Sequence, residues 1–237
     1  VPAAQGPEIP DDALILVPVR NLVLFPGMVL PVTIGRELSV TAAQAAVKLG
    51  RPVGLLLQRD PKVEKPGPAD LYGTGTVAQI LRYITTPDGA NHIVAQGEAR
   101  FRIPEFLEGH PFLVARVERL ELPEEAGRET EARLMQLKER AVQALELLPE
   151  TPQEMVQAVQ NFTSAGALAD MVAGFMDVKP PEKQAVLELI EVAPRVDRVL
   201  EMLAQRIEVM KLSREIESRT KATMDERQRE YVLREQM

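Results

Sequence analysis

The sequence predicts an α+β protein in which a mostly antiparallel β-barrel subdomain precedes an α-helical bundle ending in one long protruding helix. Three observations support this prediction. Short apolar runs separated by turn residues fill residues 13–122, apolar residues at helical spacing replace them over 123–194, and residues 195–237 contain neither Gly nor Pro. Residues 1–12 lack the basic flank and apolar core of a secretory signal, so we expect a disordered leader there.

The densest apolar stretch, residues 14–36, opens the predicted barrel. Its three interior prolines would each cost a helix about 3 kcal/mol, so we expect two short strands, residues 14–19 and 29–34. The connection between them is unusual, because loops normally carry polar side chains. Its apolar residues either fill the core or offer an exposed apolar surface; they include Leu22, Leu24, Phe25 and Met28.

The remainder of the predicted barrel consists of one helix and several short strands. Residues 37–49 are rich in Ala and precede Gly50, which is typical of a helix with a glycine C-cap. The strands are expected at residues 53–58, 74–85, 91–96, 99–106 and 112–120. Alternation in the last of them is imperfect, which indicates a bulge or burial on both faces. Closure into a barrel would remove exposed sheet edges.

Helical patterns follow from residue 123 onward. Residues 130–148 carry apolar side chains at a period of 3.6, and the next helix is expected to be capped by Thr151 with Pro152 at its first position. Two more helices are expected at residues 167–176 and 182–191. Helices this short are not stable alone in water, so they must associate in a bundle.

The last helix is predicted to span residues 195–237, on the order of 60 Å at 1.5 Å per residue. Its first part has a coiled-coil-like stripe, which ordinary bundle helices also show: Val196, Leu200, Leu203, Ile207 and Met210. The stripe then fails, because Arg214, Glu217 and Lys221 occupy its next positions. We therefore expect roughly the last 25 residues to project and to find partners outside this chain.

Several motifs resemble the N-terminal domain of bacterial Lon ATP-dependent proteases. The similar stretches are VPVRNLVLFPGM at 17–28, QRDP at 58–61, DLYGTGTVAQI at 70–80, QGEARFRI at 96–103, LAD at 168–170, EKQ at 182–184 and MDERQREYVLREQM at 224–237. The resemblance implies a PUA-like β-domain at 13–122, a helical bundle at 123–194 and, at 195–237, a helix that leads toward an ATPase module. It also implies that ATP, Mg²⁺ and a serine–lysine proteolytic dyad belong to a part of the parent protein C-terminal to Met237.

The residues themselves indicate no catalytic, cofactor-binding or metal-binding site in this chain. No Gly is followed by Lys, so the phosphate-binding loop of an ATPase is missing. Neither a nucleophile elbow nor a cluster of metal ligands is present. The absence of Cys agrees with a reducing compartment, and the resemblance implies the cytoplasm. No apolar run is long enough to cross a membrane.

Function is therefore expected to come from binding, and three interpretations remain open. The first is a substrate-recognition and oligomer-organising domain of a Lon-type protease, with unfolded or damaged proteins and other subunits of a homohexamer as partners. The second is an RNA-binding PUA-like module, although nearly balanced charge over residues 1–123 argues against nucleic acid. The third is a stand-alone adaptor that dimerises through the long helix as a coiled coil.

Two sets of residues are the candidates for these contacts. Large apolar side chains suit unfolded chains, which differ from folded ones by exposing hydrophobic groups. The candidate substrate-binding residues are Leu22, Leu24, Phe25, Met28, Met171, Phe175 and Met176. The candidates for contact with other domains or subunits are Met224, Tyr231 and Leu233.

Overall fold

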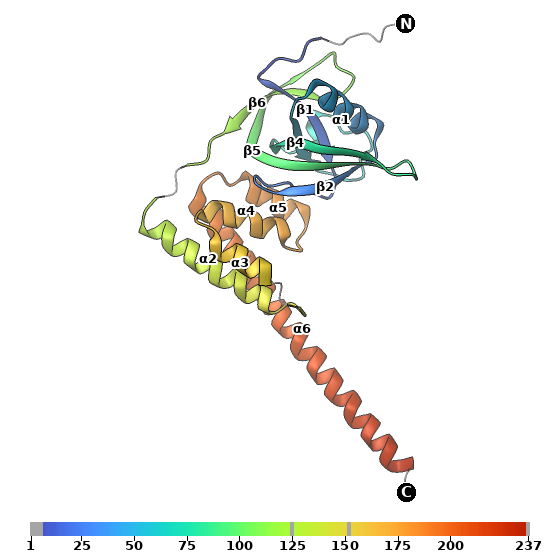
Figure 1. Cartoon of the computed structure of the whole chain (residues 1–237), viewed down its shortest axis with the longest axis vertical. Coiled ribbons are helices and arrows are strands. Elements are labelled where there is room, and N and C mark those ends of the chain that lie inside the picture. The colour runs from blue at the N-terminus through green and yellow to red at the C-terminus, as the bar shows by residue number, and fades with distance from the viewer. Residues whose placement is uncertain (1–6, 124–125, 151–152, 236–237) are drawn as a thin grey trace.

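The structure, a computed structural model, describes residues 7–123, 126–150 and 153–235. A strand-rich lobe lies against a helical lobe, from which one helix projects (Figure 1). The strand-rich lobe contains β1 (Ala13–Val19), β2 (Val29–Ile34), α1 (Glu37–Leu49), β3 (Val53–Leu57), η1 (Pro68–Asp70), β4 (Thr74–Thr85), β5 (Asn91–Leu107) and β6 (Val114–Leu120). The helical lobe contains α2 (Arg128–Glu146), α3 (Gln153–Asn161), α4 (Ala165–Phe175), α5 (Pro180–Glu188) and α6 (Val192–Glu235).

The strands form one mixed six-stranded sheet in the order β2-β5-β4-β3-β1-β6. β1 pairs with β3 in parallel, and the other pairs are antiparallel. β6, the last strand in this order, pairs with β1 and also with the second half of β5. The strands β5, β4, β3, β1 and β6 are therefore hydrogen-bonded in a closed circuit. β2 is attached to the first half of β5.

The sequence prediction was wrong in dividing β5 into two strands at residues 91–96 and 99–106. The structure has one 17-residue strand, because Gly97 stays in the ladder opposite Ala78 instead of starting a turn. The β5–β6 ladder is irregular between Arg102 and Glu105, where three steps along β5 face two steps along β6. The extra residue therefore lies in β5, not in the last strand, where the sequence indicated a possible bulge. Pro104 occupies this shift, at a place where a missing backbone N–H costs no ladder hydrogen bond.

Other predicted elements agree closely with the structure. α1 has the predicted bounds, and Gly50 closes it in the left-handed conformation at φ 62°. α4 begins earlier than the predicted residue 167, because the Ser164 hydroxyl accepts a hydrogen bond from the Ala167 amide at 3.0 Å and caps the helix. The predicted cap at Thr151 and Pro152 lies outside the described residues.

Part of the expected leader is held by the strand-rich lobe. Arg51 donates hydrogen bonds to the carbonyl oxygens of Ile9 at 2.6 Å and Pro10 at 2.8 Å. Asp12 forms an ion pair with Arg116 of β6 at 2.9 Å. Residues 9–12 are therefore held against the strand-rich lobe, and residues 1–6 lie outside the described residues.

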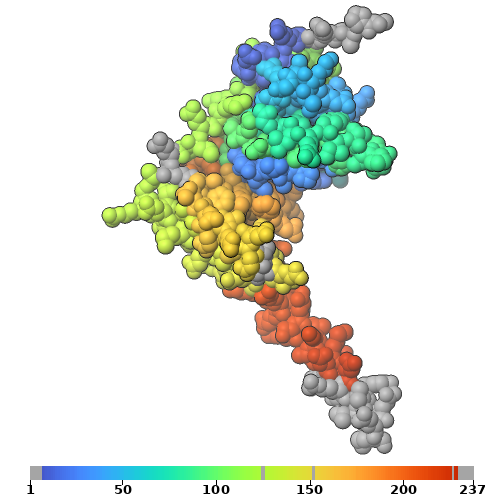
Figure 2. Space-filling model, in the orientation of Figure 1, coloured from blue at the N-terminus to red at the C-terminus, as the bar shows by residue number. Residues whose placement is uncertain are grey.

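Two hydrophobic clusters stabilise the fold. The smaller one lies among the strands and contains Leu14, Leu16, Leu56, Leu71, Val77, Phe101 and Ala115. The larger one is continuous from the opposite faces of these strands into α2, α3, α4, α5 and α6. The two lobes thus share one hydrophobic core, and the space-filling view shows them meeting along a broad boundary (Figure 2).

A buried ionic cluster crosses this boundary. Arg100 of β5 and Asp170 of α4 form a bidentate pair at 2.6 and 2.8 Å, and Arg195 of α6 lies 3.4 Å from both oxygens of the same carboxylate. The three residues are at most 2% exposed. A charge buried this deeply needs partners, so the cluster fixes how the three elements meet.

Backbone carbonyls at the C-terminal end of α5 and in the two residues after it balance the excess positive charge of this cluster. Arg100 Nε donates to the Leu187 carbonyl at 2.8 Å, Arg195 Nε donates to the Leu189 carbonyl at 2.9 Å, and Arg195 Nη2 donates to the Ile190 carbonyl. The last carbonyls of a helix carry partial negative charge and lack partners within the helix. The two arginines thereby donate hydrogen bonds to these carbonyl groups, and the carbonyl groups stabilise the buried guanidinium charges.

α6 has a packed part and a projecting part. Its first residues belong to the core, with Val196, Val199, Met202, Leu203 and Ile207 all buried. Residues 211–225 are exposed, and Figure 1 shows this part leaving the helical lobe. At 1.5 Å per residue, its 44 residues extend roughly 65 Å. The projection predicted from the failing apolar stripe is therefore present in the described residues.

We expect Asp170→Asn to destabilise the protein by about 3–5 kcal/mol, because it leaves two buried guanidinium groups without a counter-charge. Asp177→Asn is the matched control, since that carboxylate is exposed and lies 3.7 Å from Arg206. The control is expected to change stability by less than about 1 kcal/mol. Urea unfolding followed by circular dichroism measures both, and equal effects would contradict the role given to Asp170.

Candidate functional site

The connection between β1 and β2, residues 20–28, buries most of its apolar side chains, and we call it the buried turn. Its apex is hydrogen-bonded to β5: the Gly27 amide donates to the Gly97 carbonyl and the Gly97 amide to the Met28 carbonyl, both at 2.9 Å. The hydroxyl of Thr76 donates to the Leu24 carbonyl at 2.5 Å. A Cβ at Gly97 would overlap the Phe25 carbonyl oxygen, so this close approach requires glycine there.

This turn packs against α4. Phe25 is 0% exposed, and Leu24 and Met28 are also buried. Gly174 of α4 makes room for Met28, because a Cβ at that position would overlap the Met28 sulfur. The turn therefore fills the space between sheet and helices, which is the core alternative left open by the sequence.

This burial counts against the prediction that the turn contacts a substrate. Leu24, Phe25 and Met28 could meet another chain only if the core opened, and only Leu22 is half-buried. The sequence could not decide this point, because the apolar residues that cover the turn come from α4, about 150 residues later.

The other three candidate residues come together at one apolar groove. Met171, Phe175 and Met176 line a cavity of about 200 Å³ between α2, α3, α4 and α6. Met176 is buried, Met171 is half-buried and Phe175 is 60% exposed. We call this cavity the methionine groove.

Two further methionines and several aliphatic residues complete the methionine groove, and the sequence analysis did not identify them. They are Met155 of α3, Met210 of α6, and Leu145, Leu148, Val159 and Leu203. Met210 was noticed only as part of the α6 stripe. The available signal was the grouping of methionines in the helical half of the chain, but only the fold shows which of them face the same cavity.

The end of α4 beside the methionine groove is held by charged groups. The ammonium group of Lys183 donates to the Gly174 carbonyl at 2.6 Å and so closes the last turn of α4. Burial lowers the pKa of Lys183, and the nearby negative charge of Asp177 partly opposes this shift. Asp177 also pairs with Arg206 across the rim at 3.7 Å. The groove thus has an apolar floor and a charged rim.

The candidates for contact with other domains or subunits lie on the projecting part of α6. Met224 is 68% exposed, and exposed apolar residues precede it on the same helix: Val209, Leu212 and Ile216. Tyr231 and Leu233 belong to α6, but their side chains are outside the described residues.

In the part of the chain that the structure describes, no three His, Asp or Glu side chains come close enough together to hold a metal ion. The ring of His92 is hydrogen-bonded to Thr33, and His110 stacks on Phe112 with 6.4 Å between ring centroids. Across the same residues, none of the helices combines the length and apolar character needed to span a membrane.

A mixed six-stranded sheet joined to a helical lobe that carries an apolar groove defines the class of protein to which this chain belongs. Comparison with known families identifies the class. The family profile described as "ATP-dependent protease La (LON) substrate-binding domain" matches residues 13–205. The chain belongs to this LON substrate-binding domain family.

Full-length relatives and solved structures agree with this assignment. The Lon protease of Methylocella silvestris is 51% identical over 226 residues, covering 95% of this chain, and that of Phenylobacterium zucineum is 50% identical over 230 residues, covering 97%. The N-terminal domain of a Mycobacterium avium complex Lon protease aligns with a TM-score of 0.65 and 25% identity, covering 81% of this chain and 98% of that one. The chain spans only 28% to 29% of the length of the two full-length relatives.

The two candidate surfaces can be separated by one pair of substitutions with the same chemistry. Phe25→Ala is expected to cost about 3–5 kcal/mol of stability, because it empties a fully buried site. Phe175→Ala removes a mostly exposed ring and is expected to cost less than about 1 kcal/mol. Urea unfolding measures both; a small loss in Phe25→Ala would show that the turn is not core.

Proposed function

We propose that this chain captures unfolded or damaged proteins for a Lon-type ATP-dependent serine protease, and that the methionine groove is where they bind. The observation that carries the proposal is the exposed ring of Phe175 beside Met155, Met171 and Met210 in an apolar groove. Unfolded chains differ from folded ones chiefly by their exposed hydrophobic side chains. Membership of a substrate-binding family supports the same function.

Flexible thioethers suit a site that accepts many sequences. Methionine has three rotatable bonds and a polarizable sulfur, so it adapts to side chains of different shape. Burial of one apolar side chain contributes about 1.5–3 kcal/mol, which is less than even millimolar binding requires. Several such contacts must therefore act together, and each remains weak enough for release to a motor that pulls the chain away.

This assignment modifies the set of substrate-binding candidates. Met171, Phe175 and Met176 remain in it, and Leu22 remains as a half-buried neighbour of the turn. Leu24, Phe25 and Met28 act through α4: they support the helix that carries the groove residues. The RNA-binding alternative is not favoured, because positive and negative charges are nearly balanced over residues 1–123, whereas binding to phosphates requires clustered Lys and Arg.

The remaining proposals concern the parent protein. The parent binds ATP and Mg²⁺ and cleaves its substrates in modules beyond this chain, and six subunits form its ring in the cytoplasm. α6 leads toward those modules, and Met224, Tyr231 and Leu233 contact them or a neighbouring subunit. The additional pairing of β6 with β5 supports a PUA-like barrel for residues 13–122.

Phe175→Ser is expected to weaken binding of an unfolded protein about tenfold, the loss of one apolar contact. The probe is fluorescein-labelled lactalbumin, reduced and carboxymethylated so that it cannot fold, with affinity measured by fluorescence anisotropy. Met135→Ser is the control, because Met135 is 73% exposed on α2 but does not line the methionine groove. Equal effects of the two substitutions would place recognition elsewhere.

A further inference from the structure

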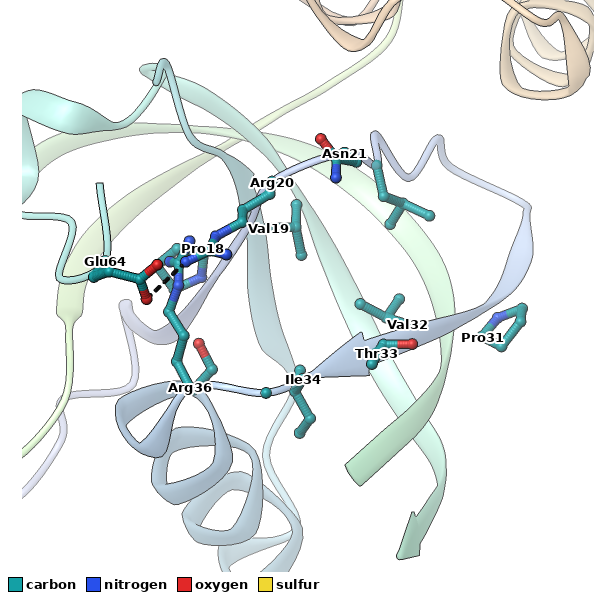
Figure 3. A pocket seen from close by; sticks show the side chains of 13 residues that line it. Pro18, Val19, Arg20, Asn21, Pro31, Val32, Thr33, Ile34, Arg36 and Glu64 are labelled. Carbon is teal, nitrogen blue, oxygen red and sulfur yellow. Dashed lines mark ion pairs between the residues drawn. The ribbon is translucent and has the colours of Figure 1, made fainter. Parts of the chain in front are cut away.

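A second hollow, in the strand-rich lobe, combines two arginines with apolar walls. It has a volume of about 490 Å³ and is lined by residues that precede the buried turn and by β2 with the start of α1. Arg20 and Arg36 extend toward each other and toward Glu64, which comes from the loop after β3 (Figure 3). We call this hollow the arginine pocket.

The guanidinium groups of the arginine pocket have unused donors. In the part of the chain that the structure describes, Arg20 Nε, Arg20 Nη2 and Arg36 Nη1 are buried and make no hydrogen bond. Glu64 Oε2 lies 3.0 Å from Arg20 Nη2, a charge contact without hydrogen-bond geometry. Nε and Nη2 together form the edge of a guanidinium that binds a carboxylate with two parallel hydrogen bonds. Glu64 lies at the Nη2 end of this edge without a hydrogen bond, and Nε also lacks a hydrogen-bond partner among the described residues.

One arginine is held by a hydrogen bond, and the carboxylate near the arginines is largely exposed. Arg36 Nη2 donates to Gln58 Oε1 at 2.6 Å, and the amide of buried Gln58 donates in turn to the Val63 carbonyl at 2.7 Å. The side chain of Glu64 is 78% exposed, and its contact with Arg20 Nη2 is an ion pair near the surface, which contributes little stability. A better-seated carboxylate can take its place.

The electrostatics of the arginine pocket also favour an incoming anion. Two guanidinium groups face one carboxylate, which leaves a formal excess of one positive charge. Burial, followed by repulsion from Arg20, lowers the pKa of Arg36, and Glu64 only partly opposes this. A buried or half-buried cation with unmet donors gains more from a counter-ion than an exposed one does.

The apolar walls restrict what kind of anion fits. Val19, Val32 and Ile34 form a buried floor beside the arginines. A ligand must therefore bring an apolar group close to its negative charge. The last residue of a polypeptide does this, because its carboxylate and its side chain are attached to the same Cα. An Asp or Glu side chain holds its carboxylate away from its neighbours' side chains.

We propose that the arginine pocket binds the C-terminal carboxylate of a substrate polypeptide that ends in apolar residues, with Arg20 and Arg36 as its ligands and Glu64 as the group it displaces. This inference rests on the proposed function, since it names a class of substrate. The arginine pocket binds the end of a substrate chain, whereas the methionine groove binds apolar segments within the chain.

The test uses the full chain and fluorescein-labelled octapeptides of sequence Gly-Ser-Gly-Ser-Ala-Ala-Leu-Leu, measured by fluorescence anisotropy. One peptide has a free C-terminal carboxylate, one is amidated, and a third is amidated but carries an internal Asp. The free acid is expected to bind about tenfold more tightly than either amide, as for a hydrogen-bonded ion pair. Equal binding of acid and amide, or equally tight binding of the Asp peptide, would overturn the proposal.

Substitutions then assign the preference to the arginine pocket. Arg20→Gln and Arg36→Gln are expected to remove the preference for the free acid, while Glu64→Gln increases it severalfold. Arg119→Gln is the control, an exposed arginine of β6 outside the pocket. Thermal unfolding verifies that the variants are folded, and Arg20→Gln leaves the bond between Arg36 and Gln58 intact. A preference that survives both arginine substitutions would contradict the assignment.

Failure of this inference is distinguishable from failure of the proposed function. If carboxymethylated lactalbumin binds and Phe175→Ser weakens it, but acid and amide peptides bind equally, only the arginine pocket proposal fails. If lactalbumin does not bind at all, the proposed function fails as well.

Discussion

The arrangement of the two lobes depends on one buried carboxylate, that of Asp170. Its two oxygens hold Arg100 of the sheet and Arg195 of the long helix, and the carbonyls at the end of α5 take the remaining donors. Hydrophobic contacts alone are non-directional, so they would tolerate small rotations between the lobes. A bidentate ion pair with no access to water does not tolerate such rotations, because any displacement leaves a charge unpaired.

The same helix positions the methionine groove. Asp170 and Gly174 are four residues apart on α4, so they share one face, which contacts Arg100 and Met28. Met171 and Phe175 have the same spacing one residue later, and they line the groove. Fixing α4 against the sheet therefore also fixes the apolar residues proposed to bind substrate. The buried turn at Phe25 acts on the groove only through this helix.

The sequence predicted what is local and missed what is long-range. α1 and its glycine cap, and the change from strands to helices near residue 123, follow from propensities and turn residues within a few positions. The pairing of Arg100 with Asp170 links residues 70 positions apart, and nothing near either residue indicates it. Both lie in stretches that resemble the family, but only the fold shows that they pair. Burial of Phe25 and the grouping of methionines from three helices were missed for the same reason.

The central claim is that unfolded chains bind the helical lobe at the methionine groove while the turn at residues 22–28 stays closed. Hydrogen–deuterium exchange of the full chain, with and without carboxymethylated lactalbumin, tests this most directly. The account predicts that substrate slows exchange in α3, α4 and the first part of α6, and leaves the slow exchange of Gly27 and Met28 unchanged. Faster exchange at the turn when substrate binds, with no protection of α4, would contradict it.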